Sequence, residues 1–232
     1  MSTLTIIGLQ TGMPRTLGTA GAAEPMDREW TTGFFKESVV EVRQVTTHGI
    51  EGDGQADLVN HGGPDKAINV YPSEHYALWS EALGLPFGAG AFGENFTTIG
   101  MTENEVCMGD IFEGGELRLQ VSQPRQPCWK LARRWRIKDL ALQVERTGRT
   151  GWYFRVLSGC SVQPGMKLNL VERPAPQWSI AIANEIMHHR KNDAAAALAL
   201  AACPGLSASW QQSLTRRAAG GASDVRTRLG ES

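Results

Sequence analysis

The segment at residues 121–130, Val-Ser-Gln-Pro-Arg-Gln-Pro-Cys-Trp-Lys, places Cys128 where a thiolate would be stabilised. If Pro127 takes the first position of a helix, Cys128 lies in the first turn, where unpaired backbone N–H groups favour negative charge. The window around it contains no acidic residue and these cations: Arg125, Lys130, Arg133, Arg134, Arg136 and Lys138. A thiolate in such surroundings can bind a soft or transition metal, or act as a nucleophile. A buried, inert cysteine beside a solvated basic helix would explain the pattern equally well.

Three further segments contain residues that could contact a bound anion or amide. In His61-Gly62-Gly63-Pro64-Asp65-Lys66, paired glycines allow backbone N–H groups to approach an anion closely, and Lys66 adds positive charge. Asn95 can both donate and accept hydrogen bonds. Lys36, which follows residues 32–35, could approach a phosphate. Taken singly, each segment is better explained as an ordinary turn or a surface lysine.

Charge, hydropathy and cysteine usage exclude several classes of protein. The formal net charge of -1 gives no global attraction to nucleic acid or to an anionic membrane. The longest apolar stretch, residues 194–203, is about half as long as the roughly 20 residues that a membrane-spanning helix needs. Residues 1–10 lack the basic start and the cleavage site of a signal peptide. The four cysteines show neither CxxC pairing nor zinc-like spacing, so we expect free thiols in a cytoplasmic protein.

The pattern of apolar residues and turns predicts a mixed α+β chain with a β-rich first part. The 26 glycines and 11 prolines indicate many turns. The expected strands cover residues 4–9, 39–45, 67–71, 96–99, 110–113, 117–122, 152–157 and 167–171. Helices are expected at 72–83, 127–135 and 137–147, whereas residues 13–27 are predicted to form a loop or flexible insertion.

Composition changes at Arg173-Pro174-Ala175-Pro176, which predicts a domain boundary. Residues 1–173 would form a β-barrel-like cofactor-binding domain. Residues 174–220 would form a three-helix domain, with helices at 179–190, 194–202 and 207–218, and residues 221–232 a mobile tail. Because all of the candidate residues precede the boundary, we expect a pocket that the first domain completes alone.

Together these segments resemble the MOSC domain, the molybdenum cofactor sulfurase C-terminal domain, and in particular its bacterial YiiM-type branch. The likeness is carried by residues 123–128, with residues 49–57, 61–71, 93–98 and 108–110 in the same order. It covers the chain from about residue 4 to the C-terminal helices. The resemblance implies a β-barrel-like MOSC core, a small C-terminal three-helix domain and a molybdenum–molybdopterin cofactor ligated by Cys128, the catalytic residue.

The resemblance also implies further contacts and an activity. By match of motif, Lys36, His61, Lys66, Asn95 and Arg125 would contact the pterin and its phosphate. The activity would be that of an oxidoreductase that reduces small N-hydroxylated compounds, including hydroxylamines and hydroxylaminopurine bases, and so detoxifies them. No cysteine cluster could hold an iron–sulfur centre, so electrons would come from a separate protein, a reductase or a ferredoxin-like carrier. No nucleic-acid or membrane partner is expected, and the sequence does not decide whether the protein forms a homodimer.

Two other functions and the source of the proton stay open at this point. The chain could carry activated sulfur or the cofactor on Cys128 without turnover. It could instead be a metal-free enzyme with a cysteine nucleophile and His61 or His75 as base. Asp53, His61 and Glu94 are equal candidates for a proton donor.

Overall fold

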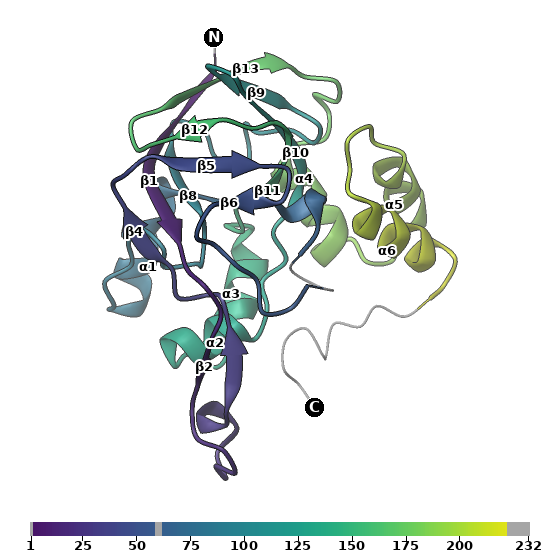
Figure 1. Ribbon diagram of the computed structural model, residues 1–232. Helices are drawn as coiled ribbons and strands as arrows, with labels where there is room; N and C mark the ends of the chain where they lie inside the picture. Colours follow the sequence, from purple (N-terminus) through teal and green to yellow (C-terminus); the bar gives the residue numbers. More distant parts are fainter. Residues whose placement is uncertain (1, 59–61, 222–232) are drawn as a thin grey trace.

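A closed barrel of seven strands forms the centre of the computed structural model, which describes residues 2–58 and 62–221 (Figure 1). In their order around the barrel, the strands are β1 (Thr3–Thr11), β13 (Lys167–Glu172), β9 (Ile111–Gly114), β10 (Leu117–Pro124), β11 (Trp152–Ser158), β7 (Ile68–Pro72) and β8 (Phe96–Ile99). Neighbours are antiparallel except β7 and β8, which are parallel. The fold is therefore mixed α+β with a β-barrel core, as the sequence predicts.

Strand β1 closes the barrel because it is long enough to pair with three partners in turn. It pairs with β13 over residues 3–5, with β8 over residues 5–9, and with β4 (Glu37–Val39) over residues 9–11. Leu4 and Ile6 are fully buried inside the barrel, and Ile7, which faces the other way, is half exposed. The register then shifts between Ile6 and Gly8, so that Leu9 is the next residue buried.

Two sequence predictions near the N-terminus are wrong. The strand expected at residues 39–45 is divided between β4 and β5 (Arg43–Thr46), because β4 pairs with β1 while β5 joins a small sheet with β6 (Gly49–Ile50) and β12 (Ser161–Val162). The loop expected at residues 13–27 contains β2 (Arg15–Leu17), which pairs with β3 (Trp30–Thr32). Its partner lies beyond the predicted loop, so no pattern within the loop could have indicated it.

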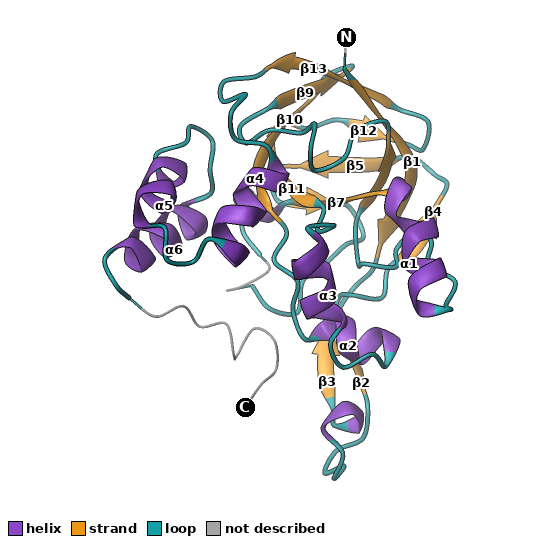
Figure 2. Cartoon of the chain, turned by 180° about the vertical axis from the view of Figure 1, so that it is seen from behind, coloured by secondary structure: helices purple, strands orange, loops and turns teal. Residues whose placement is uncertain are grey.

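The β2–β3 hairpin projects from one end of the barrel (Figures 1 and 2). At the same end, α1 (Tyr76–Leu83), α2 (Lys130–Trp135) and α3 (Leu140–Thr147) enclose a second buried cluster. This cluster consists mainly of aromatic and aliphatic side chains: Phe34, Tyr71, Trp79, Phe87, Ala91, Phe92, Leu131, Leu140, Ala141 and Val144. It fixes the loops on which the candidate residues lie.

The C-terminal part is helical, as predicted, and packs beside the barrel (Figure 1). It contains α4 (Ile180–Asn184), which continues in a π-helical turn at Glu185–His189, α5 (Ala194–Ala201) and α6 (Ala208–Ala218). Each of the three α-helices begins after a serine or aspartate whose side chain accepts a hydrogen bond from the N–H group three residues on. Trp210 and Leu214 of α6 lie in one continuous apolar cluster with the barrel interior. Among the described residues, no helix is long and apolar enough to cross a membrane.

Candidate functional site

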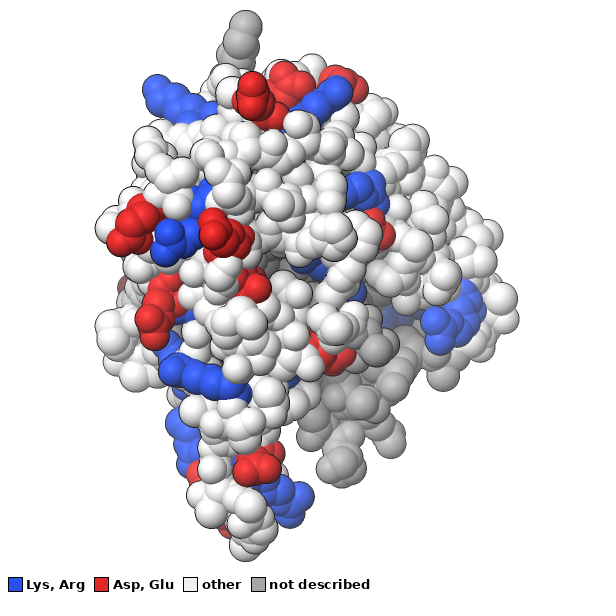
Figure 3. Space-filling view, viewed as in Figure 1, with Lys and Arg blue, Asp and Glu red and all other residues white. Residues whose placement is uncertain are grey.

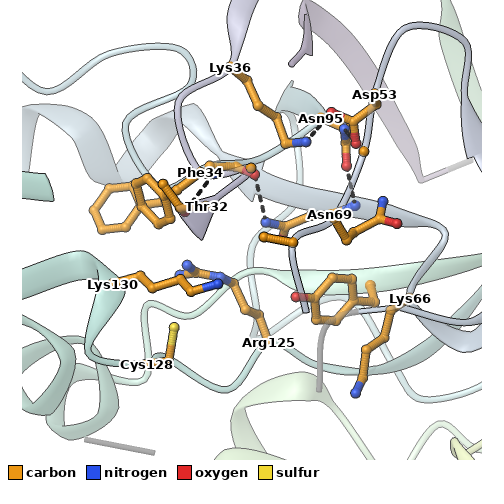
Figure 4. A pocket seen from close by; sticks show the side chains of 17 residues that line it. Thr32, Phe34, Lys36, Asp53, Lys66, Asn69, Asn95, Arg125, Cys128 and Lys130 are labelled. Carbon is orange, nitrogen blue, oxygen red and sulfur yellow. Dashed lines mark hydrogen bonds and ion pairs between the residues drawn. The ribbon is translucent and has the colours of Figure 1, made fainter. Parts of the chain in front are cut away.

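One pocket brings together residues from loops that are distant in the sequence (Figure 4). Its lining residues are Thr32, Gly33, Phe34, Lys36, Asp53, Gly54, Gln55, Ala56, Lys66, Asn69, Phe92, Gly93, Asn95, Arg125, Cys128, Lys130 and Tyr153. About 560 Å³ of the pocket, its open mouth included, is free of protein atoms. A concave pocket of this kind, with polar groups converging on an apolar lining, is the usual form of a small-molecule or cofactor site.

Five of the six residues singled out as cofactor contacts lie in this pocket. They are Lys36, Lys66, Asn95, Arg125 and Cys128. The sixth, His61, lies outside the described residues. Cys128, Lys130 and Lys66 lie along one side of the pocket, and Lys36 with its neighbours lies opposite them (Figure 4).

Cys128 lies in the turn before α2, not in the first helical turn as predicted. The helix begins at Lys130, and the Cys128 carbonyl accepts a hydrogen bond from the Leu131 N–H (3.1 Å). Before the helix, the Arg125 N–H bonds to the Gly151 carbonyl (3.1 Å), which continues the pairing of β10 with β11 past the end of the strand. The Cys128 side chain is buried but lines the pocket.

The cationic residues near Cys128 in the sequence make two kinds of contact. Arg125 and Lys130 line the pocket. Arg133 donates to the Pro25 carbonyl (2.9 Å), and Arg136 pairs with Asp27 (2.7 Å). These two contacts hold the tip of the β2–β3 hairpin against α2. Of the cations near Cys128 in the sequence, Arg125 and Lys130 therefore share the pocket with the thiol, while Arg133 and Arg136 anchor the hairpin.

Two buried polar atoms in the pocket have no hydrogen-bond partner among the described residues. One is Nη1 of Arg125, a residue that is 5% exposed and whose guanidinium lies over the Phe34 ring (5.9 Å). The other is Oδ1 of Asn69, whose Nδ2 donates to the Gly93 carbonyl (3.1 Å). An unsatisfied buried donor or acceptor costs about 1–3 kcal/mol. Groups of this kind are expected where a ligand completes the bonding.

On the opposite side, a hydrogen-bond network surrounds Asp53. Its carboxylate pairs with Lys36 Nζ and accepts hydrogen bonds from the Gly12 N–H (3.0 Å) and from Asn95 Nδ2 (2.9 Å). Asn95 Oδ1 accepts from the Asn69 N–H (3.0 Å). Burial lowers the pKa of Lys36, and the charge of Asp53 opposes that shift. This side of the pocket is therefore polar but electrically balanced, whereas the Cys128 side carries positive charge.

Removing the Asp53 carboxylate is expected to destabilise the fold, because the Lys36–Asp53 pair is almost fully buried. In Asp53→Ala, Lys36 would lack its partner, and the free energy of unfolding should fall by about 3–5 kcal/mol. Without Asp53, the pKa of Lys36 drops further below 10.5. The unfolded chain then binds more protons over the alkaline range below 10.5, so the stability of the variant should rise with pH more steeply than that of the unsubstituted protein.

Urea denaturation at several pH values measures both effects. Asp27→Ala, which breaks the exposed pair with Arg136, is the matched control and should change stability by only about 0–1 kcal/mol. Equal losses in the two variants would contradict the assignment of a buried, unsolvated pair.

Of the other acids and bases considered in the sequence, the two that the structure describes, Glu94 and His75, do not line the pocket. Glu94 is fully buried and accepts hydrogen bonds from the N–H groups of Gly90 (2.6 Å) and Phe92 (2.9 Å), so it fixes a loop. His75 Nε2 lies 2.6 Å from the Glu103 carboxylate, away from the thiol. Of the proton-donor candidates in the described residues, only Asp53 lies in the pocket. Its carboxylate already accepts hydrogen bonds from Lys36, the Gly12 N–H and Asn95.

Sequence reasoning missed Asn69 and Tyr153. Asn69 could have been found, because it is the one polar residue in an otherwise apolar buried strand, β7. Tyr153 gave no such signal, since it lies among aromatic residues in β11. Burial raises the pKa of Tyr153, and the nearby Arg125 guanidinium opposes that shift.

Surface charge gives no separate indication of a binding face. On the face drawn in Figure 3, acidic and basic side chains of the described residues are interspersed. The positive charge that could bind an anion is instead inside the pocket, which Arg125, Lys66 and Lys130 line.

Comparison with known proteins agrees with this geometry. The MOSC domain model matches residues 57–169, and the model of the YiiM-like, 3-alpha helix domain matches residues 178–221. The protein YflK of Bacillus subtilis is 43% identical over 91% of this chain and 93% of its own. The crystal structure of YiiM from Geobacillus stearothermophilus superposes with a TM-score of 0.78 at 41% identity, over 93% of this chain and 99% of that one. A protein of Gibberella moniliformis named "Reductase" is 38% identical over 70% of this chain, which spans 29% of that protein. The chain therefore belongs to the MOSC-domain family, with the YiiM-like three-helix domain at its C-terminal end.

Proposed function

We propose that this protein is a molybdenum cofactor-dependent oxidoreductase that reduces N-hydroxylated compounds, such as hydroxylamines and hydroxylaminopurine bases. The observation that carries the proposal is the meeting of the Cys128 thiol with Arg125, Lys66 and Lys130 in one pocket. A thiolate is a suitable ligand for a transition metal, and the cations suit the phosphate of a molybdopterin.

The residues of the pocket fit this cofactor. The pterin ring carries amide and amine groups, which need both donors and acceptors from the protein. Arg125 Nη1 is a buried donor and Asn69 Oδ1 a buried acceptor, and neither has a partner among the described residues. Asn95, Lys66 and Lys130 supply further contacts around the same space.

When bound, the cofactor supplies two-electron chemistry, in which R–NHOH, two electrons and two protons give R–NH2 and water. The residues of the chain hold and orient the reactants. Cys128 provides the ligand, the cations neutralise the phosphate, and Phe34 and Phe92 exclude water from part of the pocket. Asp53 anchors Lys36 and Asn95 in place. Electrons come from a separate donor, a reductase or a ferredoxin-like protein.

Two observations favour this function over the alternatives. The fungal relative named "Reductase" supports oxidoreduction, although most of that protein lies outside the match. The metal-free nucleophile requires a base beside Cys128. Of its two candidates, His75 is instead engaged by Glu103, and His61 lies outside the described residues. A carrier that holds sulfur or the cofactor without turnover is distinguished by a kinetic test, which the Discussion describes.

Removing positive charge from the pocket is expected to weaken cofactor retention. An interaction with a charged group contributes about 1.5–3 kcal/mol, so Lys66→Glu and Arg125→Gln should each reduce affinity more than tenfold. Arg125 takes the milder substitution because it is buried. The measurement is the molybdenum and pterin content of protein made in a host that synthesises the cofactor.

Lys191→Glu is the control for this experiment, because Lys191 is exposed in the C-terminal part of the chain, outside the pocket. It should retain as much cofactor as the unsubstituted protein. Equal pterin content in all of the variants would contradict the mapping of the anion contacts, and an unsubstituted protein without molybdenum would overturn the proposed function.

A further inference from the structure

The start of α6 contacts both of the segments that carry the charged side of the pocket. The Ala208 N–H donates to Asp65 Oδ2 (3.2 Å), and Asp65 directly precedes Lys66. The Ser207 N–H donates to the Ser122 carbonyl (2.8 Å), close to the end of β10, from which the chain leads to Arg125 and Cys128. The start of α6 is therefore hydrogen-bonded both to the segment that contains Lys66 and to the strand that leads to Cys128.

Asp65 is held from a second direction by Arg155 of β11. Arg155 Nε donates to Asp65 Oδ1 (2.8 Å), while Nη1 donates to Gln120 Oε1 (2.7 Å) and to the Gly205 carbonyl (3.4 Å). The Ser122 hydroxyl donates to the Asp65 carbonyl. The network thus joins the loop of Lys66, two barrel strands and the turn before α6.

The turn before α6 is seated closely on the barrel. Gly205 has a φ of +82°, and a Cβ there would lie 2.8 Å from Gly109 Cα. Only glycine combines this conformation with so close an approach. The Ser207 hydroxyl also donates to Gln123 Oε1 (2.8 Å). The position of α6 relative to β10 is therefore fixed by short contacts rather than by a flexible connection.

We propose that the C-terminal helices act on the pocket through Asp65, a positioning residue that keeps Lys66 at a fixed distance from Cys128. The proposal rests on the proposed function, since it takes the space between these residues as the cofactor site. Neither Asp65 nor α6 lines the pocket. Their effect is to hold the Lys66 loop in the bound arrangement before the ligand arrives, which lowers the entropic cost of binding.

The test compares Asp65→Ala with Asp193→Ala. Asp193 is a matched control, because its carboxylate also pairs with an arginine, Arg190, and accepts a hydrogen bond at a helix start, from the Ala196 N–H (2.9 Å). Two quantities are measured: amide hydrogen exchange of residues 62–66 in cofactor-free protein, and molybdenum and pterin content after gel filtration. In Asp65→Ala we expect about tenfold faster exchange in this segment and about tenfold weaker retention. Asp193→Ala should change neither.

A double variant separates positioning from general damage. If Asp65 acts through Lys66, then Asp65→Ala should cause no further loss of cofactor in a Lys66→Glu background. Additive losses would overturn the proposal, as would unchanged exchange at residues 62–66 or faster exchange with full retention. Should Asp65→Ala fail to fold, Asp65→Asn and Arg155→Gln serve in its place. If the unsubstituted protein never binds molybdenum, the proposed function fails, while the exchange measurement still decides whether Asp65 and α6 hold the loop.

Discussion

Cys128→Ala is expected to abolish molybdenum loading completely, whereas alanine at each of the other three cysteines should leave it intact. Of the four cysteines, Cys128 is the one that lines the pocket. Cys107 Sγ lies 3.6 Å from the Pro176 carbonyl, and burial raises the pKa of Cys203 to about 11, so both are neutral packing thiols. Cys160 lies between β11 and β12, away from the pocket. In the proposed function, Cys128 is the protein's sulfur ligand, and no other cysteine lines the pocket to replace it.

Metal analysis of the four alanine variants, made in a host that synthesises the cofactor, gives the answer directly. Because a buried cysteine is being shortened, thermal unfolding must show that Cys128→Ala is folded, and Cys128→Ser provides a variant of nearly equal volume. Full molybdenum occupancy in folded Cys128→Ala would disprove the assignment of the ligand. Loss of metal in Cys203→Ala at unchanged stability would move the site to another part of the fold.

The sequence predicts the elements of the barrel well, because their signals are local. Strands such as β8 and β11 are short runs rich in aromatic and β-branched residues, each followed by a glycine. Helix α1 ends at Gly84, which takes the left-handed conformation. The division between β4 and β5 could not be predicted in this way. It depends on which strand each segment pairs with: β4 pairs with β1, whereas β5 pairs with β6 and with β12, which lies more than 100 positions later in the sequence.

The site shows the same distinction between local chemistry and long-range arrangement. Cys128 and Arg125 stand out locally, since a cysteine in a basic segment is uncommon, and both lie in the pocket. The roles of Arg133 and Arg136 depend on the β2–β3 hairpin, whose position the local sequence does not encode. Asn69 is detectable in the sequence as the polar residue of an apolar strand, and the structure adds that its unpartnered oxygen lies in the pocket.

The arrangement around Asp65 changes how the two parts of the chain are expected to depend on each other. All of the described residues that line the pocket precede residue 174. That the first part alone contains the functional site stays a prediction. The contacts of Ala208 and Ser207 nevertheless tie the pocket segments to α6. The boundary predicted between residues 173 and 174 stays a prediction. If it is right, the second part influences ligand retention without contributing a ligand contact.

The second large effect expected is on turnover: protein loaded with cofactor should reduce an N-hydroxylated base or amine only when an electron source is added. Among the described residues, no three histidine, cysteine or acidic side chains lie together as metal ligands. The proposal therefore places the electron supply in another protein. A reduced viologen dye should replace that protein, because a small molecule can reach the pocket without a docking surface. Activity should disappear in folded Cys128→Ala and in protein from a cofactor-deficient host. The measurement is the rate of dye oxidation with hydroxylamines, hydroxylaminopurines and amidoximes, with amine formation followed in parallel.

If metal-loaded protein with reduced dye turns over none of them, a carrier of the cofactor becomes the better explanation. If metal-free protein instead hydrolyses a thioester or an ester, Cys128 is a nucleophile and the molybdenum assignment is wrong.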